Sequence, residues 1–130
     1  MYIEMDCPCK GKNLDKMLQP GILMSLYKQD KYGWLIIQEL GDNPMFGGAQ
    51  PDKTGVYRYL KKMEASGYLT SVLENAGDKD VSRRVYSITN KGRACLGNWQ
   101  VTLRSYAASI AELVDTMEET AGFTEVFQKL

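Results

Sequence analysis

The sequence predicts a mainly α (α+β) fold, in which three short helices precede a two-stranded β-hairpin and one long helix. Three observations predict it. Apolar residues recur at three- and four-residue spacing before residue 64; two runs rich in β-branched and aromatic residues, 68–74 and 81–88, flank a polar tip; and a long apolar heptad pattern follows from residue 96. This order of elements is that of a winged helix-turn-helix, with the hairpin as its wing.

Length and composition predict one small globular domain. The chain has 130 residues, 44% of them hydrophobic, which is enough for one modest core. We expect a flexible arm over 1–13, a winged-helix domain over 14–89, a dimerisation helix over 90–121 and a tail over 122–130. The first residues lack the pattern of a signal peptide, and no apolar run approaches the roughly 20 residues of a membrane helix. We therefore expect a cytoplasmic protein without a membrane partner.

The first two predicted helices carry apolar faces that end at polar or glycine-rich breaks. Pro20 suits the first turn of helix one, whose buried face is predicted to be Ile22, Leu23, Leu26 and Tyr27. A polar break is expected over 28–32. Helix two is predicted from Gly33 to about Leu40, with Trp34, Ile37 and Leu40 on one face, and it ends at the segment 41–44.

The third predicted helix has an apolar face and a basic face. Pro51 is expected at its first position. Val56, Leu60 and Met63 define the buried face, and at helical spacing Thr54, Arg58, Lys61 and Lys62 fall on the opposite side. The outer surface of this helix is therefore predicted to be polar and positively charged.

Basic side chains are concentrated between residues 53 and 93, which hold nine of the 16 bases but only four of the 16 acids of a chain with zero net charge. Such segregation is typical of a surface that binds nucleic acid. Arg58 can reach a guanine edge with two hydrogen bonds, whereas lysine and threonine suit phosphate oxygens. The candidate DNA-binding residues are Lys53, Thr54, Tyr57, Arg58, Lys61, Lys62, Lys79, Arg83 and Arg84.

Two other interpretations of this basic surface stay open. It fits an ordinary solvated helix face beside a charged hairpin. It also fits a winged-helix module that binds an acidic protein rather than DNA.

Four segments of the chain resemble the PadR family: 31–34 (Lys-Tyr-Gly-Trp), 54–57 (Thr-Gly-Val-Tyr), 60–69, and 83–93 with its Arg-Arg-Val-Tyr-Ser-Ile-Thr start. The resemblance covers about residues 18 to 117. It implies a homodimeric winged-helix transcriptional regulator, usually a repressor, that dimerises through a C-terminal helix and in some members leaves its operator when a small molecule binds. A two-fold dimer predicts a palindromic operator. We expect no cofactor.

Single residues carry this resemblance to different degrees. Tyr57 matches the tyrosine of the family's recognition helix, and Arg83, Arg84 and Tyr86 match its basic, aromatic wing strand. The chain has Tyr-Gly-Trp at 32–34 where the family commonly has His-Gly-Tyr, and it has Gly55 within the recognition helix. A glycine inside a helix costs about 1 kcal/mol relative to alanine, so Gly55 bears on the geometry of that helix.

The last predicted helix begins after Thr89, which can cap it. Its stripe of apolar residues spans about 30 Å, more than one small core can cover, and predicts a homodimer. The predicted dimer-interface residues are Leu96, Trp99, Leu103, Tyr106, Ile110, Leu113 and Met117. Trp99 and Tyr106 either fill this interface or leave a crevice in which a small aromatic effector stacks.

The content of cysteine and histidine limits the chemistry that the chain can perform. Three cysteines are expected to be reduced thiols, and Cys7 and Cys9 could form a thiol- or metal-responsive site, although a structural zinc site requires more ligands. The chain contains no histidine, which excludes histidine-based acid–base catalysis. With no glycine-rich phosphate loop and no clustered acids, we expect neither an enzyme nor a resident metal.

Overall fold

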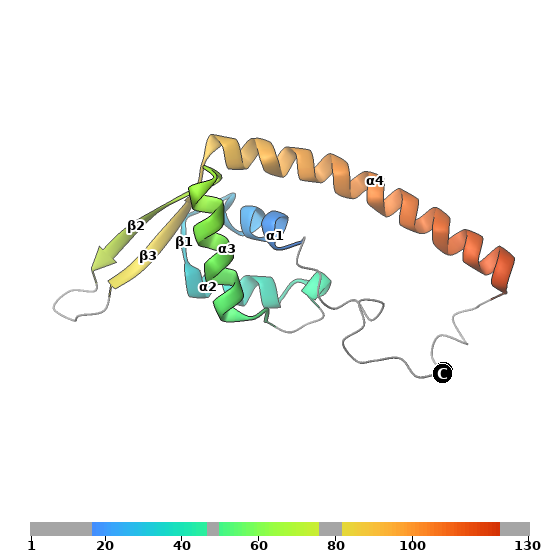
Figure 1. The fold of residues 1–130 in the computed structure, drawn as a ribbon, viewed down its shortest axis with the longest axis horizontal. Helices are drawn as coiled ribbons and strands as arrows, with labels where there is room; N and C mark the ends of the chain where they lie inside the picture. Colours follow the sequence, from blue (N-terminus) through green and yellow to red (C-terminus); the bar gives the residue numbers. More distant parts are fainter. Residues whose placement is uncertain (1–16, 47–49, 76–81, 123–130) are drawn as a thin grey trace. The chain divides into compact units, whose positions relative to one another are not determined.

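The computed structural model describes residues 17–46, 50–75 and 82–122. These residues form the helices α1 (Leu18–Leu26), α2 (Gly33–Gly41), α3 (Lys53–Ala65) and α4 (Asn90–Ala121), with a short 3-10 helix η3 at Pro44–Phe46. The strands are β1 (Lys31–Tyr32), β2 (Leu69–Asn75) and β3 (Ser82–Ile88). This order is that of a winged helix-turn-helix followed by one long helix, so the predicted fold class is confirmed (Figure 1).

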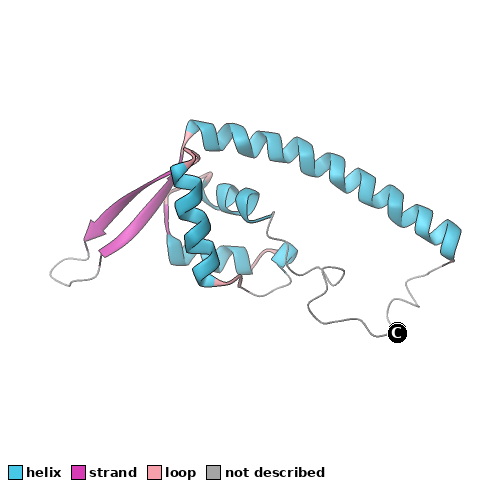
Figure 2. Ribbon diagram, in the orientation of Figure 1, coloured by secondary structure: helices cyan, strands magenta, loops and turns pink. Residues whose placement is uncertain are grey.

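The sheet has three strands in the order β1-β3-β2, all antiparallel (Figure 2). Strands β2 and β3 form the predicted hairpin, with Leu69 opposite Ile88 and Glu74 opposite Arg83. The prediction of a polar break over 28–32 was wrong for its last two residues, because Lys31 and Tyr32 pair with Tyr86 and Val85 of β3. The wing is thus joined to the start of α2.

The core of the winged-helix unit is built from one apolar face of each short helix and from Leu69 and Tyr86 of the hairpin. Tyr27 is predicted to be buried but is 43% exposed, so that prediction was wrong. Trp34, which was placed on one face of helix two with Ile37 and Leu40, is 51% exposed, whereas those two residues are buried. The ring of Tyr27 instead lies under the guanidinium of Arg93. The buried apolar side chains are Ile22, Leu23, Leu26, Ile36, Ile37, Leu40, Val56, Leu60, Met63, Leu69 and Tyr86.

A polar cluster ties α1, β1 and α2 together. The ammonium group of Lys31 donates to the backbone carbonyl of Ser25 and to the carboxylate of Glu39, at 2.6 Å from the latter. The hydroxyl of Ser25 donates to the same carboxylate oxygen. Because Lys31 is only 12% exposed, pairing offsets the cost of removing its charge from water.

Helix α3 begins at Lys53 rather than at Pro51, where it was predicted to start, because the carboxylate of Asp52 caps it by accepting from the Gly55 amide at 3.0 Å. Gly55 therefore lies in the first helical turn and not in the helix interior. The other end is a Schellman motif, in which the amides of Gly67 and Tyr68 donate to the carbonyls of Glu64 and Met63.

Helix α4 is capped as predicted, since the hydroxyl of Thr89 accepts from the amide of Gly92 at 3.0 Å. The described residues fall into two compact units that divide within α4, between Leu96 and Gly97. The first turns of α4 belong to the winged-helix unit, where Gly92 is buried against the Tyr68 carbonyl, Ile88 and Leu23.

Candidate nucleic-acid interface

The outer face of α3 presents all of its predicted DNA-binding residues to solvent. Val56, Leu60 and Met63 are buried on the opposite face, which fixes the helical phase. The predicted DNA-binding residues that are exposed on α3 are Lys53, Thr54, Tyr57, Arg58, Lys61 and Lys62. In the wing, Arg83 and Arg84 are exposed as well, whereas Lys79 lies outside the described residues.

A chain of hydrogen bonds connects the wing to α3. Arg84 donates from Nη1 to the hydroxyl of Ser71 at 2.9 Å, and that hydroxyl donates to the carboxylate of Glu64 at 2.7 Å. Glu64 lies in the last turns of α3. The network therefore holds one wing arginine in a fixed relation to the helix that carries Arg58 and Lys61.

The other wing arginine is held by β1. The guanidinium carbon of Arg83 lies 5.6 Å from the ring centroid of Tyr32, and the ring of Trp34 stacks on that of Tyr32 at 6.3 Å with an interplanar angle of 13°. The Tyr32 hydroxyl donates to Glu74 at 2.6 Å. This hydrogen bond to a carboxylate is the main cause that raises the pKa of Tyr32 above its ordinary value.

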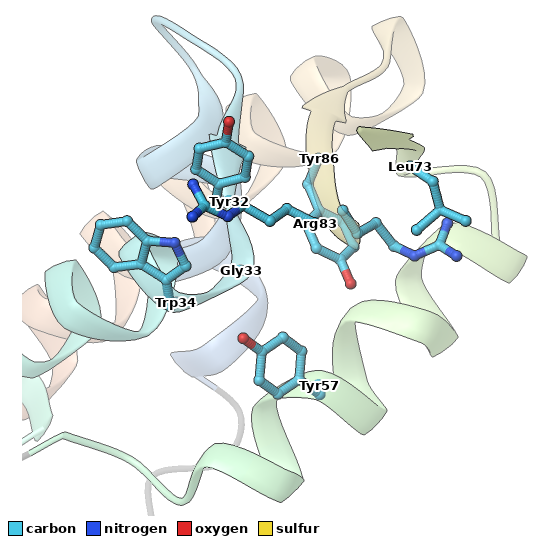
Figure 3. Close-up of a pocket in the computed structure, with 8 residues that line it drawn as sticks. Tyr32, Gly33, Trp34, Tyr57, Leu73, Arg83 and Tyr86 are labelled. Atoms are coloured by element: carbon cyan, nitrogen blue, oxygen red, sulfur yellow. The ribbon is translucent and has the colours of Figure 1, made fainter. Parts of the chain in front are cut away.

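A pocket of about 390 Å³ lies between the start of α2, the outer side of α3 and the wing (Figure 3). It brings together Tyr57 of α3 and Arg83 and Arg84 of β3, three of the residues predicted to bind DNA. The buried ring of Tyr86 also lines it, and burial raises the pKa of that phenol. The complete lining is Tyr32, Gly33, Trp34, Tyr57, Leu73, Arg83, Arg84 and Tyr86.

Tyr32, Gly33, Trp34, Leu73 and Tyr86 line the pocket but are not among the residues that the sequence predicts to bind DNA. Trp34 shares helical spacing with Ile37 and Leu40, and Tyr32 falls in the predicted polar break, so neither pattern indicates a binding site. The departure of 32–34 from the family's usual motif was the one signal that pointed to this segment. Only the pairing of β1 with β3 places it beside the wing.

The long helix α4 contains the predicted apolar stripe, which runs from Leu96 to Met117. Leu96, Trp99 and Leu103 are half-buried. Farther along, Tyr106, Ile110, Leu113 and Met117 are between 49% and 60% exposed. Assignment of the stripe to a dimer interface, and of Trp99 and Tyr106 to an effector site, stays a prediction.

Three other predictions concern metal, thiol chemistry and membranes. Cys7 and Cys9 lie outside the described residues, and the Cys95 thiol is half-buried, 3.6 Å from the side-chain oxygen of Gln19. Residues 17–46, 50–75 and 82–122 contain no group of three or more acidic, cysteine or histidine side chains arranged to hold a metal ion. Within the same ranges, no helix is long and apolar enough to cross a membrane.

Solved structures share this arrangement of a winged helix with a long final helix. A PadR family regulator from Clostridium difficile has 21% identity and a TM-score of 0.65, over 75% of this chain and 98% of that one. A transcriptional regulator from Clostridium thermocellum has 19% identity and a TM-score of 0.68, over 87% and 99%. Bacillus subtilis PadR, solved in complex with operator DNA, has 21% identity and a TM-score of 0.57, over 72% and 59%.

Fold and site thus define a winged helix-turn-helix protein with a basic, aromatic surface on α3 and the wing. Residues 22–98 match the model of the transcriptional regulator PadR-like family. The chain belongs to this family, as its sequence motifs predicted. A search of the curated proteins finds no match. Because the family consists of transcriptional regulators, the prediction that the chain is not an enzyme is confirmed.

Proposed function

We propose that the chain is a sequence-specific DNA-binding repressor in which α3 enters the major groove and the wing binds the flanking backbone. The observation that carries this proposal is the shared pocket, where Tyr57 of α3 meets Arg83 and Arg84 of β3. One duplex could then contact both elements. Bacillus subtilis PadR, whose fold this chain shares, was solved in complex with operator DNA, which supports DNA as the ligand of this surface.

The residues on α3 have different roles in this proposal. Arg58 reads a base edge, because its planar guanidinium can donate two parallel hydrogen bonds to guanine. Lys53, Thr54, Lys61 and Lys62 bind phosphates and position the helix. Because only base contacts carry sequence information, Arg58 sets base preference and the lysines set affinity.

A mobility-shift assay with the protein's own upstream region tests the proposal. We expect a specific shift that a scrambled duplex of equal length does not compete. Arg58→Ala should reduce the preference for the native duplex by about tenfold, the equivalent of one bidentate base contact. Lys28→Ala removes an equal charge from the exposed segment after α1 and should change nothing. Equal binding of native and scrambled duplexes would contradict sequence-specific recognition, and binding to neither duplex would favour an interaction module for an acidic protein.

The proposed repressor is a homodimer that pairs through the stripe on α4. Tyr106, Ile110, Leu113 and Met117 are apolar or aromatic side chains on one side of a 32-residue helix, and about half of each is exposed. A row of exposed apolar side chains along a helix is typical of a surface that packs against a partner helix. A two-fold dimer implies a palindromic operator with half-sites about 34 Å apart. Sedimentation at micromolar concentration measures the mass directly.

We also propose that a small aromatic effector stacks on Trp99 and Tyr106 and releases the repressor. Both side chains belong to the stripe, where aromatic rings of two subunits can leave a crevice. Tryptophan quenching by planar phenolic and cationic compounds tests this site. Since Trp34 also fluoresces, the titration is made in a Trp34→Phe variant. Saturable quenching that is lost in Trp99→Phe/Trp34→Phe supports the site, and its absence contradicts it.

A further inference from the structure

Tyr32 lies between two residues of opposite charge that face each other across the wing. Glu74 of β2 and Arg83 of β3 are directly paired in the strand register. The hydroxyl of Tyr32 donates to the Glu74 carboxylate at 2.6 Å, while the Arg83 guanidinium lies over its ring (Figure 3). One side chain therefore contacts both members of the cross-strand pair, through its hydroxyl and its ring.

Without Tyr32, the expected partner of Glu74 is Arg83. Directly opposite residues of an antiparallel pair project to the same face, and opposite charges there attract. Among the residues that the structure describes, however, the one ion pair is Lys31 with Glu39. The hydrogen bond to Glu74 is the largest cause of the raised pKa of Tyr32, and Arg83 acts in the opposite direction, which agrees with a phenol that lies between the two residues and donates to Glu74.

We propose that Tyr32 is a positioning residue of the wing, which holds the Glu74 carboxylate away from Arg83 and thereby leaves that guanidinium uncompensated for a DNA phosphate. The aromatic ring orients the guanidinium by a cation–π contact, which does not neutralise its charge. This role rests on the proposed DNA binding. It explains why Glu74 can lie opposite Arg83 without neutralising the charge of its guanidinium.

The hydroxyl can be removed while the ring is kept. In Tyr32→Phe we expect Glu74 to turn to Arg83, and the affinity for the upstream duplex to fall by about tenfold, the equivalent of one charge-assisted hydrogen bond to phosphate. In the Glu74→Gln background the same substitution should change affinity by less than about twofold, because no carboxylate remains to capture Arg83. Comparing the two backgrounds cancels any general effect of removing a negative charge near DNA.

Tyr27→Phe is the matched control. Its ring also lies under an arginine, Arg93, at 4.8 Å, but its hydroxyl forms no hydrogen bond with any described residue. We expect it to bind DNA as the wild type does. An equal loss of affinity for Tyr32→Phe in both Glu74 backgrounds would mean that Tyr32 acts only on the fold, and would overturn the proposal.

A measurement without DNA separates this inference from the proposed function. In the free protein, the Arg83 Nε hydrogen should exchange more slowly with solvent in Tyr32→Phe than in the wild type, because Glu74 then accepts from it. Unchanged exchange overturns the role of Tyr32 even if DNA binds. Slower exchange in a protein that binds no specific duplex supports the role and contradicts the proposed function alone.

Discussion

The phenol ring of Tyr57 occupies the space into which a side chain at Gly33 would project. A β-carbon on Gly33 would lie 2.5 Å from Cε1 and 3.1 Å from the hydroxyl oxygen of Tyr57. Gly33 opens α2, and Tyr57 lies on the outer side of α3. A glycine at the start of one helix thus sets the position of an exposed aromatic ring on the next, at the edge of the pocket.

The first prediction concerns this contact. Gly33→Ala should displace the Tyr57 ring and weaken binding to the upstream duplex by about fivefold, while the free energy of unfolding changes by less than about 1 kcal/mol. The ring is 38% exposed and can move, and alanine restricts the unfolded chain, which offsets part of the clash. Fluorescence anisotropy and urea unfolding measure the two effects.

Gly97→Ala is the control for the helical preference of alanine, since Gly97 lies in α4 and its added β-carbon would have no described atom within 4 Å beyond the adjacent residues and the local helix backbone. This variant should be more stable than the wild type by about 0.5–1 kcal/mol, with unchanged DNA affinity. If Gly33→Ala binds DNA as well as Gly97→Ala does, the position of Tyr57 has no part in recognition.

The second prediction concerns the end of α3. Gly67 has φ of +87°, the left-handed conformation that closes the Schellman motif. Gly67→Ala should destabilise the protein by about 1–2 kcal/mol, because a β-carbon is strained in this region even where space is available. Urea unfolding measures the loss. An unchanged unfolding midpoint would show that the motif does not form.

The third prediction concerns the junction of hairpin and α4. The hydroxyl of Thr89 donates to the Gly67 carbonyl at 2.7 Å and accepts from the Gly92 amide at 3.0 Å. Thr89→Val keeps the shape and should cost about 1–2 kcal/mol of unfolding free energy. Thr116→Val removes a hydroxyl that bonds within α4, to the Glu112 carbonyl, and should cost much less. Equal losses would argue against a special role for Thr89.

The fourth prediction concerns the stripe on α4. Ile110 is 60% exposed in one chain, so a charge there is tolerated by a monomer but not in an apolar interface. At micromolar concentration the wild type should sediment as a dimer and Ile110→Asp as a monomer. Val101→Asp, at a 71% exposed position outside the stripe, should remain dimeric. If the wild type is monomeric, the assignment of the stripe to a dimer interface is wrong.

Much of the fold could be predicted because its signals are local. The buried face of α3 follows from the spacing of Val56, Leu60 and Met63, and the start of α4 from the capping ability of Thr89. The start of α3 was misplaced by two residues, since Pro51 and Asp52 both signal a helix start. The helix begins directly after Asp52 because the Asp52 carboxylate accepts a hydrogen bond from the Gly55 amide, which would otherwise lack a partner.

The pocket could be predicted only in part, because it depends on contacts between distant segments. The exposed bases of α3 and β3 follow from periodicity and charge. The position of Tyr32 does not, because a strand of two residues has no alternation to detect and its partner lies more than fifty residues away, at Val85. The position of Trp34 in the pocket does not follow from the sequence either, since helical spacing cannot distinguish a core residue from one that lines a pocket.

The most direct test of the central claim, that α3 and the wing bind one DNA duplex, is the salt dependence of affinity. The slope of log K against log salt should be steep for the wild type. The magnitude of this slope should fall by about 0.9 for each phosphate that the protein no longer neutralises. Because a dimer carries two copies of Arg84, the slope of Arg84→Ala should be smaller in magnitude by about two. Lys28→Ala should keep the wild-type slope. An Arg84→Ala slope equal to that of the wild type would contradict the account.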